Sequence, residues 1–129
     1  MDRKLEERLD RIEKAITQST DQKVKYLNFR ITVNPLSIGK QTDTSPLTGT
    51  VSSVTLSYPR GAQLVESFLY IRGRQVFPEG RVGIIIDGVT KEFTVREPVG
   101  KGDPITVKVV NHDSAWSYSI SCIVKIEGR

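Results

Sequence analysis

The 129-residue sequence has few of the residues that usually carry enzyme chemistry. It contains one cysteine, Cys122, and one histidine, His112, so that neither a disulfide within the chain nor a zinc site of several His and Cys ligands can form. Its acidic residues are scattered and show neither an Asp-x-Asp pair nor the spacing of a calcium loop. We therefore expect no bound metal and no cofactor.

The three residue types of a catalytic triad occur together only as neighbours, at His112, Asp113 and Ser114. A nucleophile, a base and an orienting carboxylate must converge from different elements, and Asp-Ser is more typical of a turn. Residues 100–103, Gly-Lys-Gly-Asp, lack the earlier glycine and the Ser/Thr of a phosphate-binding loop. Cys122 falls on the inward face of a predicted strand, where a small buried residue is expected. The sequence indicates a protein that is not an enzyme.

Long apolar runs and strongly biased charge are also missing. No segment is apolar enough to span a bilayer, and the first ten residues are charged where a signal peptide needs an apolar stretch. The formal net charge of +4 is diffuse: residues 1–25 hold seven Lys/Arg against six Asp/Glu, and the remainder twelve against nine. A dedicated nucleic-acid binder usually concentrates its charge more than this. We expect a soluble protein made in a cytoplasm, without a membrane partner.

Residues 1–19 have the pattern of an amphipathic helical arm. Four apolar residues are spaced four, three and four apart, the rhythm of a coiled coil: Leu5, Leu9, Ile12 and Ile16. We predict that this arm makes the protein a homo-oligomer, with a trimer preferred over a dimer. Ile16 at position a favours a dimer and Ile12 at position d does not, so the core residues leave the number open. The alternative is a lone helix on the surface of the domain, because two heptads are too short to be stable alone.

From Val24 the apolar period changes from helical to alternating, which predicts β-structure for residues 20–129. We predict strands near residues 24–33, 51–58, 63–72, 105–110 and 118–126, and a long loop over residues 34–50. We also predict a hairpin over Arg81–Arg96, with a type I′ turn at Asp87-Gly88. The expected fold is mainly β: an antiparallel sandwich of seven or eight strands, of jelly-roll or immunoglobulin-like type.

Two of these predicted elements carry a further expectation about burial. In the hairpin, four residues should share the buried face: Ile84, Ile86, Val89 and Phe93. The strand near 63–72 is apolar on both faces. It should therefore be central in a sheet, or covered on its outer face by a partner.

Two groups of residues are candidate contacts for a ligand or partner. The first consists of arginines that lie close in sequence: Arg60, Arg72, Arg74 and Arg81. Tyr70 and Phe77 lie among them, as in sheets that stack bases and hold phosphates, although IRGRQVF does not match the RNA-recognition pattern. Arginines at turns are also normally solvated. The second candidate is Trp116, whose ring could stack on a sugar or simply cover the end of a core.

Two short motifs resemble small β-rich proteins from the head-gene regions of tailed phages and related viruses. They are Tyr58-Pro59-Arg60-Gly61, followed by an apolar strand, and Arg72-Gly73-Arg74-Gln75-Val76-Phe77-Pro78, and the resemblance covers about Tyr58 to Ile126. Those proteins carry an acidic, Asp-rich segment where this sequence has Asp87-Gly88 and a basic balance. The resemblance implies a non-enzymatic virion structural protein, a capsid decoration or head-associated protein that binds other capsid subunits and resides in the virion. The residues themselves leave an alternative, a β-sandwich binding module for nucleic acid or carbohydrate.

Overall fold

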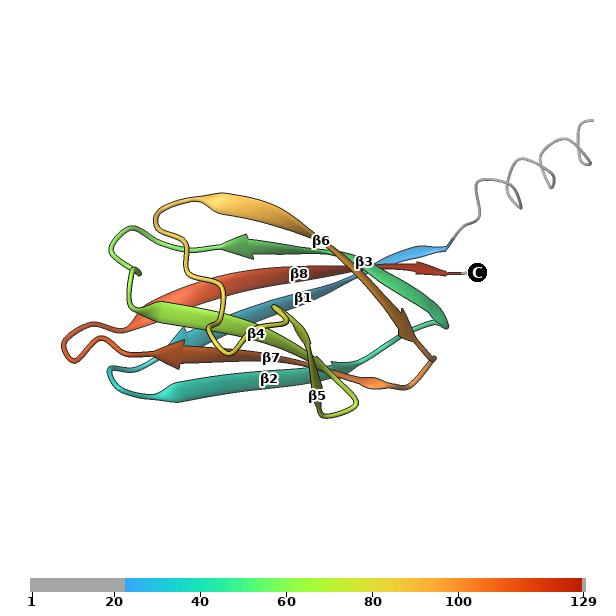
Figure 1. The fold of residues 1–129 in the computed structure, drawn as a ribbon, viewed down its shortest axis with the longest axis horizontal. Helices are drawn as coiled ribbons and strands as arrows, with labels where there is room; N and C mark the ends of the chain where they lie inside the picture. Colours follow the sequence, from blue (N-terminus) through green and yellow to red (C-terminus); the bar gives the residue numbers. More distant parts are fainter. Residues whose placement is uncertain (1–22, 129) are drawn as a thin grey trace, which may run out of the picture.

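Eight β-strands form two antiparallel four-stranded sheets in residues 23–128, the part of the chain that the computed structural model describes (Figure 1). The strands are β1 (Val24–Val33), β2 (Ile38–Thr44), β3 (Gly49–Ser57), β4 (Val65–Ile71), β5 (Arg74–Phe77), β6 (Thr90–Val99), β7 (Pro104–Asn111) and β8 (Tyr118–Gly128). Sheet 1 has the order β1-β8-β3-β6 and sheet 2 the order β2-β7-β4-β5. The predicted antiparallel β-sandwich is confirmed for this part of the chain.

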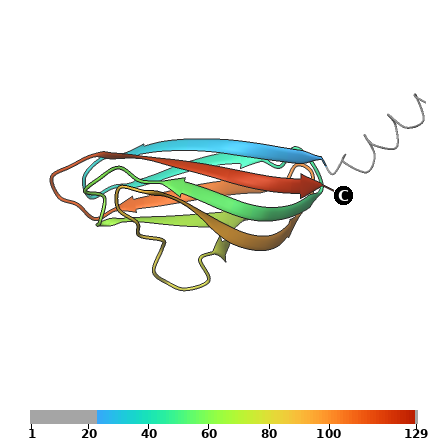
Figure 2. The same cartoon turned by 90° about the horizontal axis from the view of Figure 1, so that it is seen from above.

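The connections between the strands are those of a jelly roll. Only β4 and β5 follow each other within one sheet, and each of the other six connections crosses to the opposite sheet. In an immunoglobulin-like sandwich several consecutive strands stay in the same sheet, so that alternative does not fit. Figure 2 looks onto the outer face of sheet 1, with β1, β8, β3 and β6 side by side in front of sheet 2.

The core lies between the sheets and is filled by alternate residues of each strand. The face predicted for the first strand is confirmed: Leu27, Phe29, Ile31 and Val33 are all buried. On β8, Cys122 is buried as expected, and desolvation raises the pKa of its thiol to about 12. A thiol that stays protonated at neutral pH is a poor nucleophile, which agrees with a packing role for Cys122.

The long loop predicted over residues 34–50 is wrong in its centre, because β2 runs through it. The strand pairs with β7 along its whole length, from Ile38 opposite Val110 to Thr44 opposite Pro104. Its sequence, IGKQTDT, has almost no apolar alternation because β2 is an edge strand whose side chains are mostly exposed. Backbone pairing rather than side-chain burial holds it in place.

The predicted hairpin over Arg81–Arg96 is also wrong. β6 pairs with β3 in sheet 1, whereas Ile84 forms an isolated bridge with Ser67 of β4 in sheet 2. The segment between them therefore passes from one sheet to the other instead of turning back. Three of the four residues expected on the buried face, Ile84, Ile86 and Phe93, do pack against the core, but Val89 is half exposed.

The tight two-residue turn lies instead at Arg72-Gly73, between β4 and β5. Both residues have positive φ, 54° and 76°, as a type I′ turn requires, and Ile71 pairs with Arg74 across it. At Asp87-Gly88 the Asp87 carboxylate instead accepts hydrogen bonds from the Gly61 amide (2.7 Å) and the Gln63 side chain (3.1 Å). These bonds hold the pKa of Asp87 below its usual value and link two connections that lie far apart in sequence.

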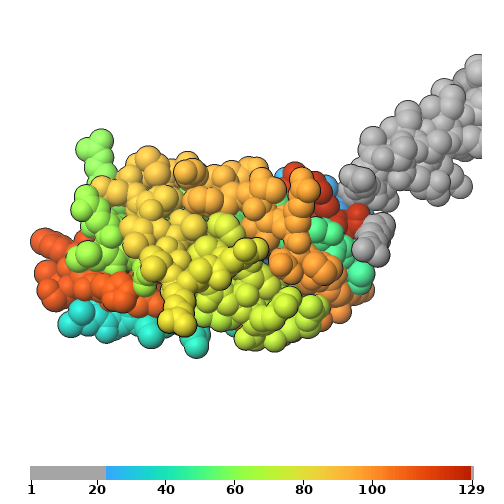
Figure 3. Space-filling model, in the orientation of Figure 1, coloured from blue at the N-terminus to red at the C-terminus, as the bar shows by residue number. Residues whose placement is uncertain are grey.

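Around Phe68, the outer face of β4 is covered by the chain itself. β4 is central in sheet 2, as predicted, and its outward Phe68 is buried. Gly83 lies so close that a Cβ there would come within 2.9 Å of the Phe68 ring. Figure 3 shows the segment that contains Gly83, in yellow, across the near face of the molecule.

The predicted helical arm and its oligomerisation residues Leu5, Leu9, Ile12 and Ile16 lie outside the described residues. Among residues 23–128 no helix is long and apolar enough to cross a membrane. The arm therefore stays a prediction from the heptad spacing.

Candidate ligand-binding face

The outer face of sheet 2 carries two rows of side chains in register across β2, β7 and β4. One row, called here the threonine row, joins Thr42, Thr106 and Tyr70. The neighbouring lysine row joins Lys40, Lys108 and Phe68. Successive residues of a strand point to opposite faces, so strand residues two apart place both rows on the same surface.

A hollow of about 300 Å³ lies on this face, over the threonine row and next to the β4–β5 turn. Its lining residues come from three strands and the turn: Lys40, Thr42, Tyr70, Gly73 and Thr106. Gly73 adopts positive φ, which glycine does without strain, and no atom lies within 4 Å of where its Cβ would be. The rim is therefore low and open beside the Tyr70 ring.

The threonine row offers an aromatic ring next to paired hydroxyl groups. The hydroxyls of Thr42 and Thr106 lie 2.8 Å apart in a hydrogen bond between neighbouring strands. Each hydroxyl keeps further capacity, since a threonine can donate one hydrogen bond and accept two. The hollow thus combines an aromatic side chain, Tyr70, with groups that can exchange hydrogen bonds with a ligand.

The lysine row brings positive charge to the same surface. The ammonium group of Lys108 lies 5.2 Å from the Phe68 ring centre and 5.8 Å from the Tyr70 ring centre. Both distances are in the range of cation–π attraction. The attraction holds the Lys108 charge close to the hollow instead of letting it extend into solvent.

One end of the face is fixed by Asp103, which precedes β7. Its carboxylate accepts a hydrogen bond from the Gly100 amide (2.7 Å) and forms an ion pair with Arg72 (2.6 Å). The Gly100 amide and then Arg72 lower the pKa of Asp103. Arg72 is therefore engaged by an acid at the turn.

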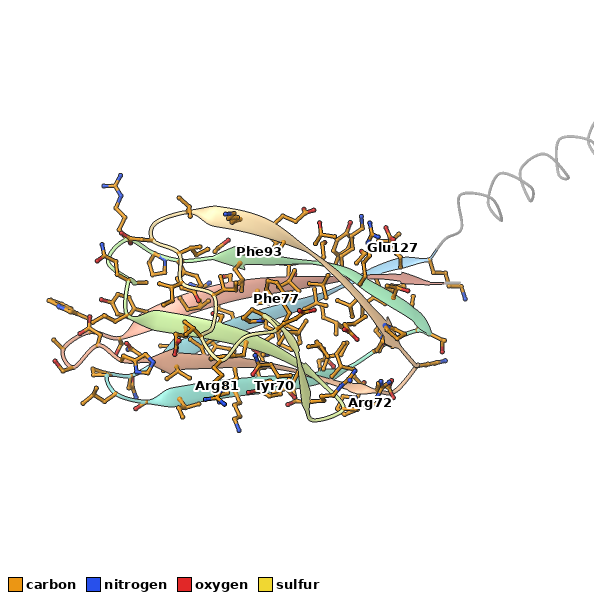
Figure 4. All side chains as sticks on the ribbon, in the orientation of Figure 1. Tyr70, Arg72, Phe77, Arg81, Phe93 and Glu127 are labelled. Atoms are coloured by element: carbon orange, nitrogen blue, oxygen red, sulfur yellow. The ribbon has the colours of Figure 1, made fainter. Side chains whose placement is uncertain are left out.

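The four predicted arginines do not form one cluster. Arg60 lies in the β3–β4 connection, at the end of the sandwich opposite the β4–β5 turn, where Arg72 is in the turn and Arg74 is the first residue of β5. Arg74 lies 3.7 Å from Glu97 of β6 in an ion pair. Figure 4 shows Arg81 and Arg72 along the same lower side of the view as Tyr70, the side of sheet 2.

Trp116 lies in the β7–β8 connection, at the end of the sandwich away from the hollow, and its side chain is 68% exposed. The Asp113 carboxylate holds this loop by accepting hydrogen bonds from the amides of Ala115 (2.8 Å) and Trp116 (3.2 Å). The hydrogen bond from the Ala115 amide is the largest cause of the lowered pKa of Asp113, and the bond from the Tyr118 hydroxyl is the second. His112 pairs with Glu66 (2.7 Å), so His112, Asp113 and Ser114 do not converge as a triad.

The residues that carry the viral resemblance have structural contacts. The Tyr58 hydroxyl donates to the Ile84 carbonyl (2.7 Å) and also bonds with Ser67. The Gln75 side chain donates to the carbonyls of Pro78 (2.6 Å) and Gly80 (2.8 Å). Both side chains fix the segment that follows β5, which accounts for these motifs through the fold.

Sequence reasoning missed four residues of this face: Lys40, Thr42, Thr106 and Lys108. The first two fall in the stretch expected to be a loop. The other two alternate with Ile105, Val107 and Val109 on β7, and this alternation did predict that they point outward. Their neighbours across the sheet could not be identified without the position of β2. Among residues 23–128 no group of three or more His, Cys, Asp or Glu could hold a metal ion.

The fold and its polar, aromatic face define a jelly-roll β-sandwich with a candidate ligand site on one sheet. No family model matches this chain, and no curated protein matches it. Several solved structures are similar at low identity.

One is a Bacillus endospore appendage, from disulfide-linked pili, with 16% identity and a TM-score of 0.49 over 82% of this chain and 88% of that chain. A second is the CBM36-1 domain of a multidomain xylanase from the hindgut metagenome of Trinervitermes trinervoides, with 20% identity and a TM-score of 0.47 over 76% and 77%. A third is the Yersinia pseudotuberculosis-derived mitogen, with 12% identity and a TM-score of 0.47 over 81% and 88%. At identities of 20% or less and TM-scores below 0.5, these similarities say nothing about the function of this chain.

Proposed function

We propose that this protein is a carbohydrate-binding module that holds a sugar in the hollow on sheet 2. The observation that carries the proposal is the threonine row, in which the Tyr70 ring lies beside the hydrogen-bonded hydroxyls of Thr42 and Thr106. A sugar presents an apolar face of C–H groups and a rim of hydroxyls. A ring next to hydrogen-bonding side chains is complementary to both. The volume of the hollow is at the lower end of the range for small-ligand sites, roughly 300–1,000 Å³.

A single strand of nucleic acid fits the face less well. Such ligands are held by several aromatic platforms along a continuous positive groove. Phe68 is buried in contact with Lys108, so Tyr70 is the ring that lines the hollow. The arginines at the turn, Arg72 and Arg74, are paired with carboxylates. The face therefore fits a sugar better than a strand of nucleic acid.

Binding to a glycan array and to insoluble polysaccharides tests this function. Tyr70→Ala should weaken binding by at least about tenfold, or about 1.4 kcal/mol, because the ring face is lost, whereas Tyr70→Phe should keep most of it. Trp116→Ala is the matched control, since it removes a larger and more exposed ring at the far end of the sandwich. The proposal fails if no glycan binds, or if the Trp116 variant loses binding while the Tyr70 variant retains it.

The virion role stays a prediction from the resemblance, as does the expectation that the protein is not an enzyme. A shell protein should co-sediment with assembled capsids, and its gene should lie beside capsid, portal or terminase genes. A free binding module should do neither. If both hold, sugar binding on sheet 2 would be a property of a virion protein; if neither holds, the virion role is wrong.

A further inference from the structure

Lys40 and Lys108 face each other directly across the β2–β7 pair. Like charges at opposed positions of neighbouring antiparallel strands destabilise a sheet. Among residues 23–128 neither lysine takes part in an ion pair: the four pairs found there are Arg72–Asp103, Arg74–Glu97, His112–Glu66 and Lys125–Glu127. The repulsion between the two lysines is therefore not offset by an acid of the described chain.

Both charges lie at the hollow. Lys40 lines it, and Lys108 is held beside the Tyr70 ring by its contacts with two aromatic rings. The nearest outward acid on β4, Glu66, is already engaged by His112 (2.7 Å) and by the Gly83 amide (3.2 Å). Asp103 at the end of the face is engaged by Arg72. An anionic group bound near Tyr70 would therefore lie close to two ammonium groups. The carboxylates of Glu66 and Asp103 are both paired with other groups and would not repel it as free charges.

We propose that the sugar held against Tyr70 carries a negative charge, as a uronate carboxylate or a sulfate ester, and that Lys40 and Lys108 bind this group. This inference rests on the proposed carbohydrate-binding function. The anion offsets the repulsion between the lysines, and hydrogen bonds between ammonium and anionic oxygens are stronger than neutral ones. Side-chain arrangements that destabilise the free protein, such as two opposed lysines, are typical of functional sites.

The test compares polymers that differ in charge and share a backbone. Polygalacturonate is paired with its methyl ester, and dextran sulfate with dextran, so that carboxylate and sulfate are probed separately. The full-length chain should bind the acidic member of one pair at least about tenfold more tightly than the neutral member. Raising the salt from about 50 to about 500 mM should reduce this preference, because salt screens exposed charges.

Lys40→Gln and Lys108→Gln should each weaken binding of the acidic polymer by about 3- to 10-fold and reduce the preference for the acidic over the neutral polymer. Lys91→Gln is the matched control: it removes the same charge from another lysine held over a ring, 5.4 Å from Phe93, on sheet 1. It should leave both affinities unchanged. Lys40→Gln should also unfold at the same or a slightly higher temperature, because the opposed charge is gone.

The outcomes separate this inference from the function on which it rests. Equal binding of acidic and neutral polymers overturns the inference and leaves the carbohydrate-binding function standing, whereas binding of no glycan at all overturns both. If a single-stranded oligonucleotide binds more tightly than every acidic glycan, the ligand of this face is nucleic acid and the inference is wrong. A large drop in the unfolding temperature of Lys40→Gln would assign that residue a structural role and overturn it as well.

Discussion

At the scale of single residues, a few buried polar side chains hold the loops of this sandwich together. Asn111 is the clearest case, because it is 1% exposed at the end of β7 and three carbonyls share the two N–H groups of its amide. The acceptors are Val33 (3.3 Å), Asn34 (3.2 Å) and Trp116 (2.8 Å). Its carbonyl accepts from the Asp113 amide (2.9 Å), so that every polar group of the side chain is used.

We expect Asn111→Ala to lower the free energy of unfolding by about 2–3 kcal/mol, because it leaves buried carbonyls without donors. Chemical denaturation measures the change. Ser114→Ala, an exposed position in the same connection, is the control and should change stability by less than about 0.5 kcal/mol. Equal stability of the two variants would mean that water replaces the amide without loss.

Three carboxylates make stability depend on pH in a defined direction. Hydrogen bonds from Gln63 and the Gly61 amide lower the pKa of Asp87. The largest cause of the lowered pKa is a hydrogen bond from the Gly100 amide at Asp103 and from the Ala115 amide at Asp113. A carboxyl whose pKa is lower in the folded state stabilises the fold above its unfolded pKa of about 3.9, and loses that contribution as the pH falls through the folded value.

These three groups therefore leave stability unchanged between about pH 5 and 7 and reduce it below about pH 4. Denaturation at a series of pH values measures the drop. Asp103→Asn should make the drop smaller, because one of the three titrating groups is removed. A stability that rises on acidification in this acidic range would contradict this account.

At the scale of strands, the sequence predicted elements that bury an alternating face and missed those held by other means. The strand at 24–33 was found because Leu27, Phe29, Ile31 and Val33 alternate, and all four are buried. β2 was missed because its inward positions are occupied by residues such as Gly39, where a Cβ would lie 2.6 Å from the Ile31 side chain. The candidate site depends on β2, so the lining residues that β2 contributes could not be placed from the sequence.

The Asp87-Gly88 hairpin failed for a different reason. The apolar segments on both sides of the turn do pack against the core. Each pairs with a strand that lies far from it in sequence, however: Ile84 with β4 and Phe93 with β3. A local turn signal cannot reveal that competition, because it is decided by tertiary pairing. The two-residue turn that does form, Arg72-Gly73, has an arginine where asparagine or aspartate is more usual.

The segment that crosses between the sheets should be sensitive to side-chain size at Gly83. We expect Gly83→Ala to destabilise the protein by about 1–3 kcal/mol, because the new methyl group would overlap the Phe68 ring and the Glu66 Cβ. Gly80→Ala is the matched control in the same segment, since no atom lies within 4 Å of where its Cβ would be and its φ is not positive. Thermal unfolding of the two variants decides, and equal melting temperatures would show that the segment does not pack on β4.

At the scale of the whole molecule, the predicted helical arm has a consequence for association. The heptad spacing of Leu5, Leu9, Ile12 and Ile16 predicts a homo-oligomer, a trimer before a dimer. Light scattering should give a multiple of 14.4 kDa for the full chain and a monomer for a chain that begins at Lys23. Every strand of the sandwich lies within that shorter chain. A monomeric full chain would leave the arm as a surface helix.

An oligomer would also matter for sugar binding. A face with one aromatic ring is expected to bind a single sugar weakly, and linking several copies raises the apparent affinity for a polymer without new contacts. The full chain should therefore bind a polysaccharide more tightly than the chain that begins at Lys23, while both bind a short oligosaccharide equally. Equal affinity of both chains for the polymer would show that oligomerisation does not contribute to sugar binding.

The central claim is that the outer face of sheet 2 binds the ligand, and backbone NMR during titration with a binding glycan tests it most directly. The amide signals that shift most should belong to β2, β7 and the end of β4, around Thr42, Thr106 and Tyr70. Shifts confined to the loop that carries Trp116, or to the β5–β6 side of the sandwich, would contradict it.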